Sequence, residues 1–282
     1  MQTLASDASQ SRWGATLTLP EGLIKTGDYF SQQLGDRDIA IKEAYALLYA
    51  LQAFSSHLEN TRVDALVDNK VLYHAWLRQG CRNQGVNQAL KSIFDTTLRY
   101  NMALSIQWIP SASNPADQPS REWSDADAQL AQPLWECVEE LHGPHTIDLM
   151  ALDSNSKCPR HYTPSPSPLS TGLNFFSQNP LYDVQGRVEN GYIFPPIYLI
   201  GPAIRHILTA QATATVIVPG ITPRPFWWPK LLHHARDRHR LARQGDTDAL
   251  IWPSKKHGFH QPRNLPLPWD LWAFRLVGLQ PE

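Results

Sequence analysis

The chain has 282 residues, of which 42% are apolar and 18% are charged, so it is long enough for two domains and too apolar for an intrinsically disordered protein. A formal net charge of −1 excludes a uniformly basic nucleic-acid-binding protein. The sequence has neither the roughly 18-residue apolar run of a membrane span nor a secretory signal pattern. Its three cysteines (Cys81, Cys137 and Cys158) are odd in number and far apart, as reduced thiols are. We therefore expect an intracellular protein of the cytoplasm or nucleus, with no membrane partner.

Alternating strand and helix patterns fill residues 1–110. Trp13, Ala15, Leu17 and Leu19 alternate with small or polar residues, as in a half-buried strand. From residue 38 to residue 58 the apolar positions recur at three- and four-residue steps, which predicts an amphipathic helix. We expect strands over residues 3–8, 13–19, 23–30, 63–67 and 104–108, and helices over residues 38–58, 71–77, 86–100 and from about 114.

The pattern changes after residue 123. Residues 124–145 are expected to form a mostly polar helical connector, and residues 146–282 a C-terminal domain with strands over 192–194 and 214–218 and a helix over 200–210. The Pro-Ser run at 163–171 predicts a surface loop, and the last stretch, rich in Pro and Trp, shows no clear pattern. The predicted fold class is α/β: a mixed five-stranded sheet with flanking helices over residues 1–123, followed by a second, smaller α/β domain.

Four acidic residues fall where neighbouring elements would gather them: Asp7 in the first strand, Glu43 on the long helix, Asp68 after the fourth strand and Asp117 at the start of the helix near residue 114. Leu47 and Ala50 share a helix face with Glu43, so Glu43 points toward the sheet. Carboxylates gathered near an apolar sheet repel one another unless a cation neutralises them, and hard oxygen ligands suit Mg²⁺ or Mn²⁺. Two such ions, about 3.5–4 Å apart, would activate a water and stabilise the leaving oxygen in an attack on phosphate. The alternative is four unrelated surface carboxylates.

Four strings carry a resemblance to a known family: Ser6-Asp7-Ala8-Ser9 with Trp13-Gly14-Ala15, Ile41-Lys42-Glu43-Ala44, Val67-Asp68-Asn69, and Asn114-Pro115-Ala116-Asp117-Gln118-Pro119-Ser120-Arg121. Together they resemble the ribonuclease H domain of reverse transcriptases, most of all that of DIRS-like, tyrosine-recombinase retrotransposons. The resemblance implies a ribonuclease H-like fold that cleaves the RNA strand of an RNA–DNA hybrid. It assigns catalytic and metal-binding roles, with two Mg²⁺ (or Mn²⁺) ions, to Asp7, Glu43, Asp68 and Asp117.

The sequence departs from this family at one place, and it also lacks a histidine that bacterial-type ribonucleases H often have. Gln118-Pro119 stands where the family commonly has small apolar residues, although proline is tolerated in a first helical turn. No histidine precedes Asp117 in the loop, so product release is expected to differ or to be slow. The chain begins within the first ribonuclease H strand, which implies an upstream reverse transcriptase polymerase domain that this chain lacks.

Three further residues are candidates for nucleic-acid binding: Ser9, Asn69 and Arg121. Ser9 and Asn69 lie within two residues of a catalytic aspartate and could hydrogen-bond a sugar or a phosphate, or could satisfy local turns. Arg121 could reach a phosphate or form a surface ion pair.

The second half carries a different resemblance. Asp148-Leu149-Met150-Ala151, residues 155–163 and Phe194-Pro195-Pro196-Ile197 are similar to phage-type adenine-N6 methyltransferases. Phe194 and Ile197 replace the polar and aromatic residues that act on the flipped base in that family, so the region resembles a degenerate member and should not methylate DNA. The alternative is a structural or nucleic-acid-docking domain. Residues 224–263 carry nine Lys/Arg against three Asp/Glu. Their histidines and arginines at 233–240 are interpreted as a solvated helix face or, with Trp227, Trp228 and Trp252, as a polyanion site.

Two rival functions remain open. One is a domesticated, non-catalytic nucleic-acid-binding protein, against which four intact carboxylates argue. The other is a DNA-cutting integrase on the same fold, which usually relies on three carboxylates. The eight-residue string that ends at Arg121 favours the ribonuclease.

Overall fold

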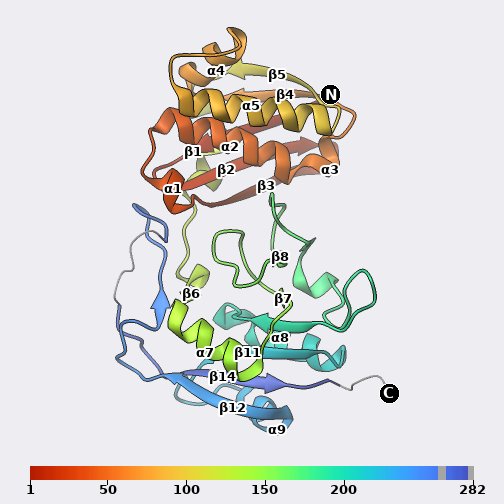
Figure 1. The fold of residues 1–282 in the computed structure, drawn as a ribbon, viewed down its shortest axis with the longest axis vertical. Helices are drawn as coiled ribbons and strands as arrows, with labels where there is room; N and C mark the ends of the chain where they lie inside the picture. Colours follow the sequence, from red (N-terminus) through yellow and green to blue (C-terminus); the bar gives the residue numbers. More distant parts are fainter. Residues whose placement is uncertain (260–264, 279–282) are drawn as a thin grey trace. The chain divides into compact units, whose positions relative to one another are not determined.

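The structure, a computed structural model, describes residues 1–259 and 265–278 (Figure 1). Its chain forms two compact units. Unit 1 consists of Met1–Trp123, Ser165–Leu169 and a segment that begins at Ser254, and unit 2 contains the remaining described residues, including the expected connector 124–145.

Unit 1 is built on one mixed sheet in the order β3-β2-β1-β4-β5. β1, β2 and β3 pair antiparallel, whereas β4 and β5 run parallel to β1. The strands are β1 (Gln2–Ala8), β2 (Arg12–Leu19), β3 (Gly22–Tyr29), β4 (Arg62–Val67) and β5 (Ala103–Trp108). The helices are α1 (Gln32–Gly35), α2 (Ile39–Ala53), α3 (Ser55–Leu58), α4 (Lys70–Leu77), α5 (Gln84–Arg99), the 3-10 helix η1 (Ser111–Ser113) and α6 (Asp117–Arg121).

Helix α2 is the central helix of unit 1. Asp38 precedes its first residue and caps it: the Asp38 side chain accepts a hydrogen bond from the Ala40 backbone N–H at 3.1 Å. Leu47 and Leu51 are fully buried in the core of unit 1. The sequence predicted one helix over residues 38–58, but the structure breaks it at Phe54, where the backbone leaves the helical region and the ring is fully buried.

Unit 2 has a second five-stranded sheet in the order β12-β14-β11-β10-β7, in which β7, β10 and β11 are parallel and β14 is antiparallel to β11. Its strands are β6 (Gln129–Leu130), β7 (Ile147–Asp148), β8 (Tyr162–Thr163), β9 (Gly172–Leu173), β10 (Asn190–Ile193), β11 (Thr213–Pro219), β12 (Ala235–Ala242), β13 (Leu250–Ile251) and β14 (Leu271–Leu276). Its helices are η2 (Asp125–Asp127), α7 (Gln132–His142), η3 (Phe175–Ser177), η4 (Ile197–Leu199), α8 (Ile200–Thr209) and α9 (Trp228–His234).

The predicted fold class is confirmed: unit 1 has the five-stranded mixed sheet with flanking helices, and a second α/β unit follows. The interpretation of residues 233–240 as a helix face is wrong from Ala235 onward, because this segment pairs with β14 as the edge strand β12. The three cysteines, all within the described residues, are free thiols as expected. None of the helices in residues 1–259 and 265–278 is both long and apolar enough to cross a membrane.

Candidate functional site

Strand pairing brings Asp7 and Asp68 side by side. β1 and β4 are parallel, and their last paired residues are Ala5 and Leu66. Two residues beyond each of these positions lie Asp7 and Asp68, so both carboxylates leave the same edge of the sheet. The parallel pairing of β1 with β4 therefore brings together two residues that are 61 positions apart in the sequence.

Glu43 approaches the same edge from helix α2, which packs on the sheet. One ligand oxygen from each of Asp7, Glu43 and Asp68 lies within 4.8 Å of the others. Asp7 and Glu43 are 3% and 5% exposed, and Glu43 Oε2 has no hydrogen-bond partner among the described residues. Three carboxylates so close together, with one buried oxygen unpaired, require a positive charge or a proton.

The pKa values of Glu43 and Asp7 are both raised in this cluster. Burial is the main cause that raises the pKa of Glu43, with the negative charges of Asp7 and Asp68 adding to it, from 4.5 to about 9. Burial likewise raises the pKa of Asp7, although the hydrogen bond from Ser120 opposes the rise. A bound divalent cation would reverse both effects, because it favours the ionised forms.

Asp117 stands beside this group rather than within it. It is the first residue of α6, its side chain is 40% exposed, and its Oδ1 receives hydrogen bonds from Nε and Nη2 of Arg121, both at 2.8 Å. The Asp117 charge nevertheless contributes to the raised pKa of Asp7. The structure thus brings together three of the four predicted carboxylates and places the fourth next to them in an ion pair.

The loop before Asp117 is anchored to strand β1 by one amide. Asn114 Nδ2 donates to the backbone oxygen of Ser6 at 2.9 Å, and Asn114 Oδ1 accepts from the Ala116 backbone N–H at 3.1 Å. Asn114 is 6% exposed and Ala116 is fully buried. These contacts fix the start of α6 next to the strand that carries Asp7.

Helix α6 packs on the sheet where glycine leaves room for it. A Cβ on Gly14 would lie 2.1 Å from the Ser120 backbone nitrogen, so any larger residue in β2 would displace α6. Because α6 sits this close, the buried Ser120 hydroxyl donates a hydrogen bond to Asp7 Oδ2. The glycine of β2 therefore helps to orient a carboxylate on β1.

The predicted nucleic-acid contacts are placed as follows. Ser9 Oγ donates to the Arg12 backbone oxygen at 3.2 Å and accepts from the Arg12 N–H at 3.1 Å, so it closes the turn between β1 and β2. Asn69 caps helix α4 by accepting from the Leu72 N–H at 3.0 Å. Arg121 is held by Asp117 and its side chain is 63% exposed. Of the three, Arg121 is the cation, and its exposed guanidinium can reach a phosphate.

Sequence reasoning missed three residues that support the site. Asn114 and Ser120 were visible as part of the eight-residue string, but nothing in it says that they contact β1. Ser111, whose hydroxyl donates to Asp68 Oδ2, lies in η1 and carried no signal in the sequence. All three orient backbone or carboxylate groups around the cluster.

The donor set fits a divalent metal. It offers oxygen ligands only, from carboxylates that would otherwise repel one another, and it leaves Glu43 Oε2 without a partner in the described part of the chain. Such a set suits Mg²⁺ or Mn²⁺. Asp7, Glu43 and Asp68 are the residues that would hold the metal.

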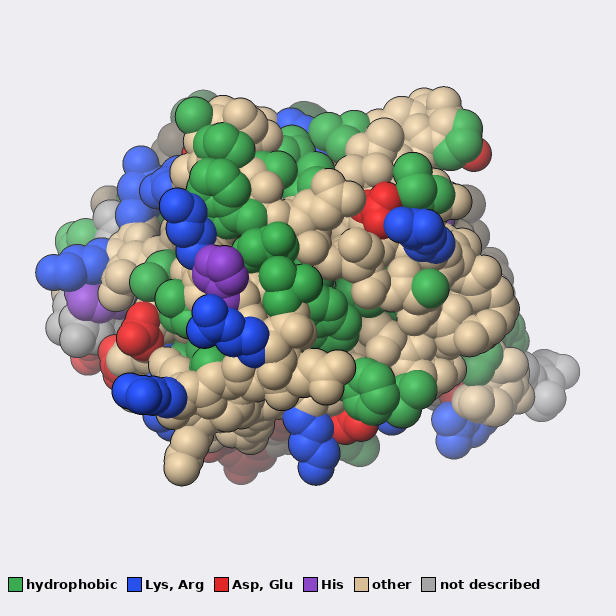
Figure 2. Space-filling view, turned by 90° about the horizontal axis from the view of Figure 1, so that it is seen from above, with side chains coloured by type: hydrophobic (Ala, Val, Ile, Leu, Met, Phe, Trp, Pro, Cys, Tyr) green, Lys and Arg blue, Asp and Glu red, His purple; other side chains and the backbone are tan. Residues whose placement is uncertain are grey.

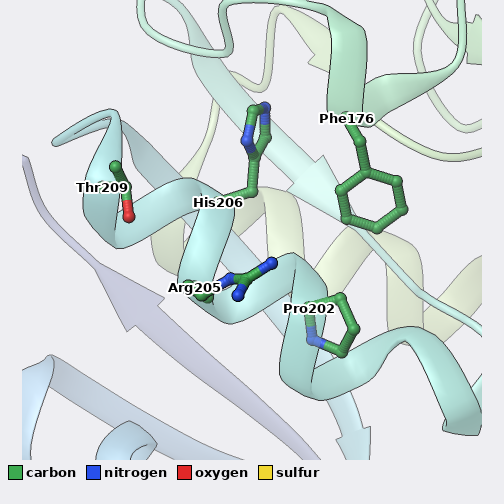
Figure 3. A pocket seen from close by; sticks show the side chains of 5 residues that line it. All are labelled: Phe176, Pro202, Arg205, His206 and Thr209. Atoms are coloured by element: carbon green, nitrogen blue, oxygen red, sulfur yellow. The ribbon is translucent and has the colours of Figure 1, made fainter.

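In unit 2, the string Phe194-Pro195-Pro196-Ile197 lies at the carboxyl end of β10, between the parallel strands β7 and β11. Ile197 is 52% exposed and Tyr198 is 76% exposed. A nearby surface hollow of about 370 Å³ is lined by four residues of α8 and by Phe176 from η3 (Figure 3): Phe176, Pro202, Arg205, His206 and Thr209. This lining has a single arginine and no carboxylate, so it offers no oxygen ligands like those of Asp7, Glu43 and Asp68 in unit 1.

The basic stretch 224–263 does not match its predicted role in full. Trp227 and Trp228 are 5% and 7% exposed and belong to the core of unit 2, so they cannot stack on bases. Arg263 lies outside the described residues. On a different face of the molecule, the one seen from above Figure 1, Lys and Arg side chains lie among apolar ones (Figure 2).

No protein-family model and no curated protein matches this chain. Solved structures are similar to it at low identity. RNase H1 from the halophilic archaeon Halobacterium salinarum NRC-1 is 18% identical, with a TM-score of 0.36. The N-terminal RNase H domain of rv2228c from Mycobacterium tuberculosis is 13% identical, with a TM-score of 0.33, and LC11-RNase H1 in complex with an RNA/DNA hybrid is 16% identical, with a TM-score of 0.35. Each of the three alignments covers 42% of this chain and 92% of the other chain.

Proposed function

We propose that unit 1 is a metal-dependent endonuclease that cleaves the RNA strand of RNA–DNA hybrids. The observation that carries this proposal is the carboxylate cluster: ligand oxygens of Asp7, Glu43 and Asp68 lie within 4.8 Å of one another at the edge of a mixed sheet. Burial and the charges of Asp7 and Asp68 raise the pKa of Glu43 to about 9, and a divalent cation would relieve this unfavourable burial of negative charge.

Each residue has a role in this proposal. Asp7, Glu43 and Asp68 hold the ions, and Asp117 is the fourth ligand once Arg121 engages a phosphate instead. Ser120 keeps the Asp7 carboxylate in place. A pair of Mg²⁺ or Mn²⁺ ions held there would supply an activated water and charge stabilisation for the leaving oxygen. No side-chain nucleophile is needed.

The finer parts of the proposal rest on the sequence strings. The strings at residues 6–15, 41–44, 67–69 and 114–121 support a hybrid as the substrate and a retrotransposon reverse transcriptase as the origin. The same origin suggests an upstream polymerase domain as partner and an intracellular location in the cytoplasm or nucleus. Unit 2 is proposed to be a degenerate methyltransferase-like region that helps to hold nucleic acid.

A cleavage assay on the full chain tests the proposal. Matched RNA–DNA hybrid, duplex DNA and duplex RNA are incubated with the protein in Mg²⁺ and in Mn²⁺, and we expect cutting of the hybrid's RNA strand to leave 3′-hydroxyl ends. Binding of the hybrid without cleavage would instead establish the non-catalytic nucleic-acid-binding function. Cleavage of duplex DNA in preference to the hybrid would favour an integrase-like activity.

A matched pair of variants assigns the activity to the cluster. Asp68→Asn keeps the shape of the side chain but removes a metal ligand, so cleavage should fall by orders of magnitude. Asp95→Asn makes the same chemical change at an exposed position of helix α5 and should leave cleavage unchanged. If the Asp68→Asn protein turned over at the parental rate, Asp68 would not be a ligand.

A further inference from the structure

A second group of potential metal ligands lies in unit 2, where strand β12 meets the end of helix α7. Asp237 and His239 are two residues apart on β12, so their side chains leave the same face of the strand. His142 is the last residue of α7. One ligand atom from each of the three residues lies within 4.8 Å of the others.

His142 is the unusual member of this group. Its side chain is only 5% exposed, and neither ring nitrogen has a hydrogen-bond partner within residues 1–259 and 265–278. A buried imidazole with both nitrogens unpaired is costly, so it calls for an explanation.

The distances suit a small tetrahedral ion. Asp237 Oδ2 lies 2.8 Å from His239 Nε2 and 3.6 Å from His142 Nε2. Ligands about 2.0–2.1 Å from a tetrahedral Zn²⁺ ion are separated by about 3.3 Å, and the two distances bracket this value. We propose that His142, Asp237 and His239 bind one Zn²⁺ ion, with a water molecule as the fourth ligand.

Solvent can reach the fourth position. The Asp237 side chain is 52% exposed and that of His239 is 37% exposed, so the site is open on the side of β12 and closed on the side of His142. Two nitrogens and one carboxylate oxygen with an open position match the ligand set of zinc sites that keep a water. The mixed donors also distinguish this site from the all-oxygen cluster of unit 1.

Neighbouring polar groups hold His142 in position. Asn190 Nδ2 donates to the His142 backbone oxygen at 2.9 Å, and Asn190 Oδ1 accepts from Arg275 Nη1 at 2.6 Å. The Arg275 guanidinium also donates to Thr215 Oγ1 at 3.1 Å. The arginine charge lowers affinity for a cation, but the carboxylate of Asp237 opposes it. Bound zinc would therefore clamp the end of α7 to the edge strand of the sheet.

The proposal is tested on the full chain after chelator treatment and dialysis. Zn²⁺ is titrated by calorimetry, and Co²⁺ is used as a visible probe because four-coordinate cobalt with histidine ligands absorbs far more strongly than cobalt bound by carboxylates and water. Saturating Mg²⁺ is kept present throughout, because the carboxylate cluster of unit 1 would otherwise take up Zn²⁺ as well. Under these conditions we expect one equivalent of Zn²⁺, an intense Co²⁺ spectrum that Zn²⁺ displaces, and a higher unfolding temperature for the part of the chain that contains β12.

Variants separate this site from incidental binding. Asp237→Asn changes an exposed side chain, so the protein should still fold. Loss of a residue that only hydrogen-bonds to a metal ligand lowers metal affinity by ~10–100-fold. Loss of the ligand Asp237 should lower the Zn²⁺ affinity by at least this factor. His142→Ala should abolish the cobalt spectrum. The control is the double variant His233→Ala and His234→Ala, which removes two exposed adjacent histidines of α9 and should change nothing.

Two results would overturn the proposal. One is a folded full chain that binds no Zn²⁺ and gives no four-coordinate Co²⁺ spectrum. The other is binding that Asp237→Asn leaves intact and the His233/His234 control abolishes. Because the readouts are metal affinity and spectrum, neither result depends on whether unit 1 cleaves nucleic acid.

Discussion

Replacing Glu43 by glutamine should stabilise the metal-free protein, and by an amount that depends on pH. In the folded, metal-free state burial and acidic neighbours raise the pKa of Glu43 from 4.5 to about 9. At pH 7 the residue is therefore protonated in the folded protein and ionised in the unfolded protein. The cost of protonating it corresponds to the difference between pH 7 and its ordinary pKa of 4.5, about 2.5 units. At about 1.4 kcal/mol per unit, this lowers the free energy of unfolding by about 3 kcal/mol. Glutamine removes this cost, and its side-chain oxygen can still accept the backbone hydrogen bond from Ala8 that lowers the pKa of Glu43.

The sign of the effect follows from the raised pKa. The contribution of Glu43 to stability is fully present below pH 4.5 and is lost as pH rises toward about 9, so the two proteins should be alike at pH 4.5 and differ most at pH 9. Hydrogen exchange with mass spectrometry on peptides from β1 and β4, with chelator present, measures this for unit 1 alone, and comparison at equal pH cancels the intrinsic exchange rates. Saturating Mg²⁺ should stabilise the parent and not the variant. A difference that did not change with pH would refute the reasoning.

Two further predictions concern helix α6. Gly14→Ala places a methyl group 2.1 Å from the Ser120 backbone nitrogen, so it should destabilise unit 1 by about 1–3 kcal/mol or more and reduce cleavage, as measured by denaturant unfolding and by the hybrid assay. Parental stability in this variant would show that α6 has room to move. Arg121→Ala breaks an exposed ion pair, so stability should change by less than about 1 kcal/mol. The salt dependence of hybrid binding should drop by about one unit of slope, and an unchanged slope would exclude a phosphate contact.

The fold of unit 1 could be predicted because its patterns are strong and local. Leu47 and Leu51 recur at helical spacing and are fully buried, and the alternation of Trp13, Ala15 and Leu17 identified β2. Unit 2 was harder, because strand β12 carries charged residues at the edge of a sheet, where solvent permits them. Without the antiparallel partner β14, such a segment looks like an exposed helix.

The site could be predicted only in part, for a related reason. Asp7, Glu43 and Asp68 could be chosen because each follows or occupies an element whose direction the pattern indicates. The hydrogen bonds of Asn114 to Ser6 and of Ser120 to Asp7 join residues more than 100 positions apart, and only the packed structure reveals them. The same holds for His142, which lies at the end of helix α7 and approaches Asp237 and His239 of strand β12.

The contact of α6 with β1 also fixes the order in which a growing chain can assemble the site. Asp7 is synthesised first, and the Ser120 hydroxyl that orients it, like Asn114 that anchors the loop before α6, comes more than 100 residues later. At a synthesis rate of about 5–20 residues per second, β1 leaves the ribosome several seconds or more before Asn114 and Ser120 do. During translation the carboxylates of β1, α2 and β4 therefore meet before the helix that completes their surroundings. A ribosome-bound chain that ends before residue 120 should therefore hold the three carboxylates without the Ser120 hydroxyl that orients Asp7.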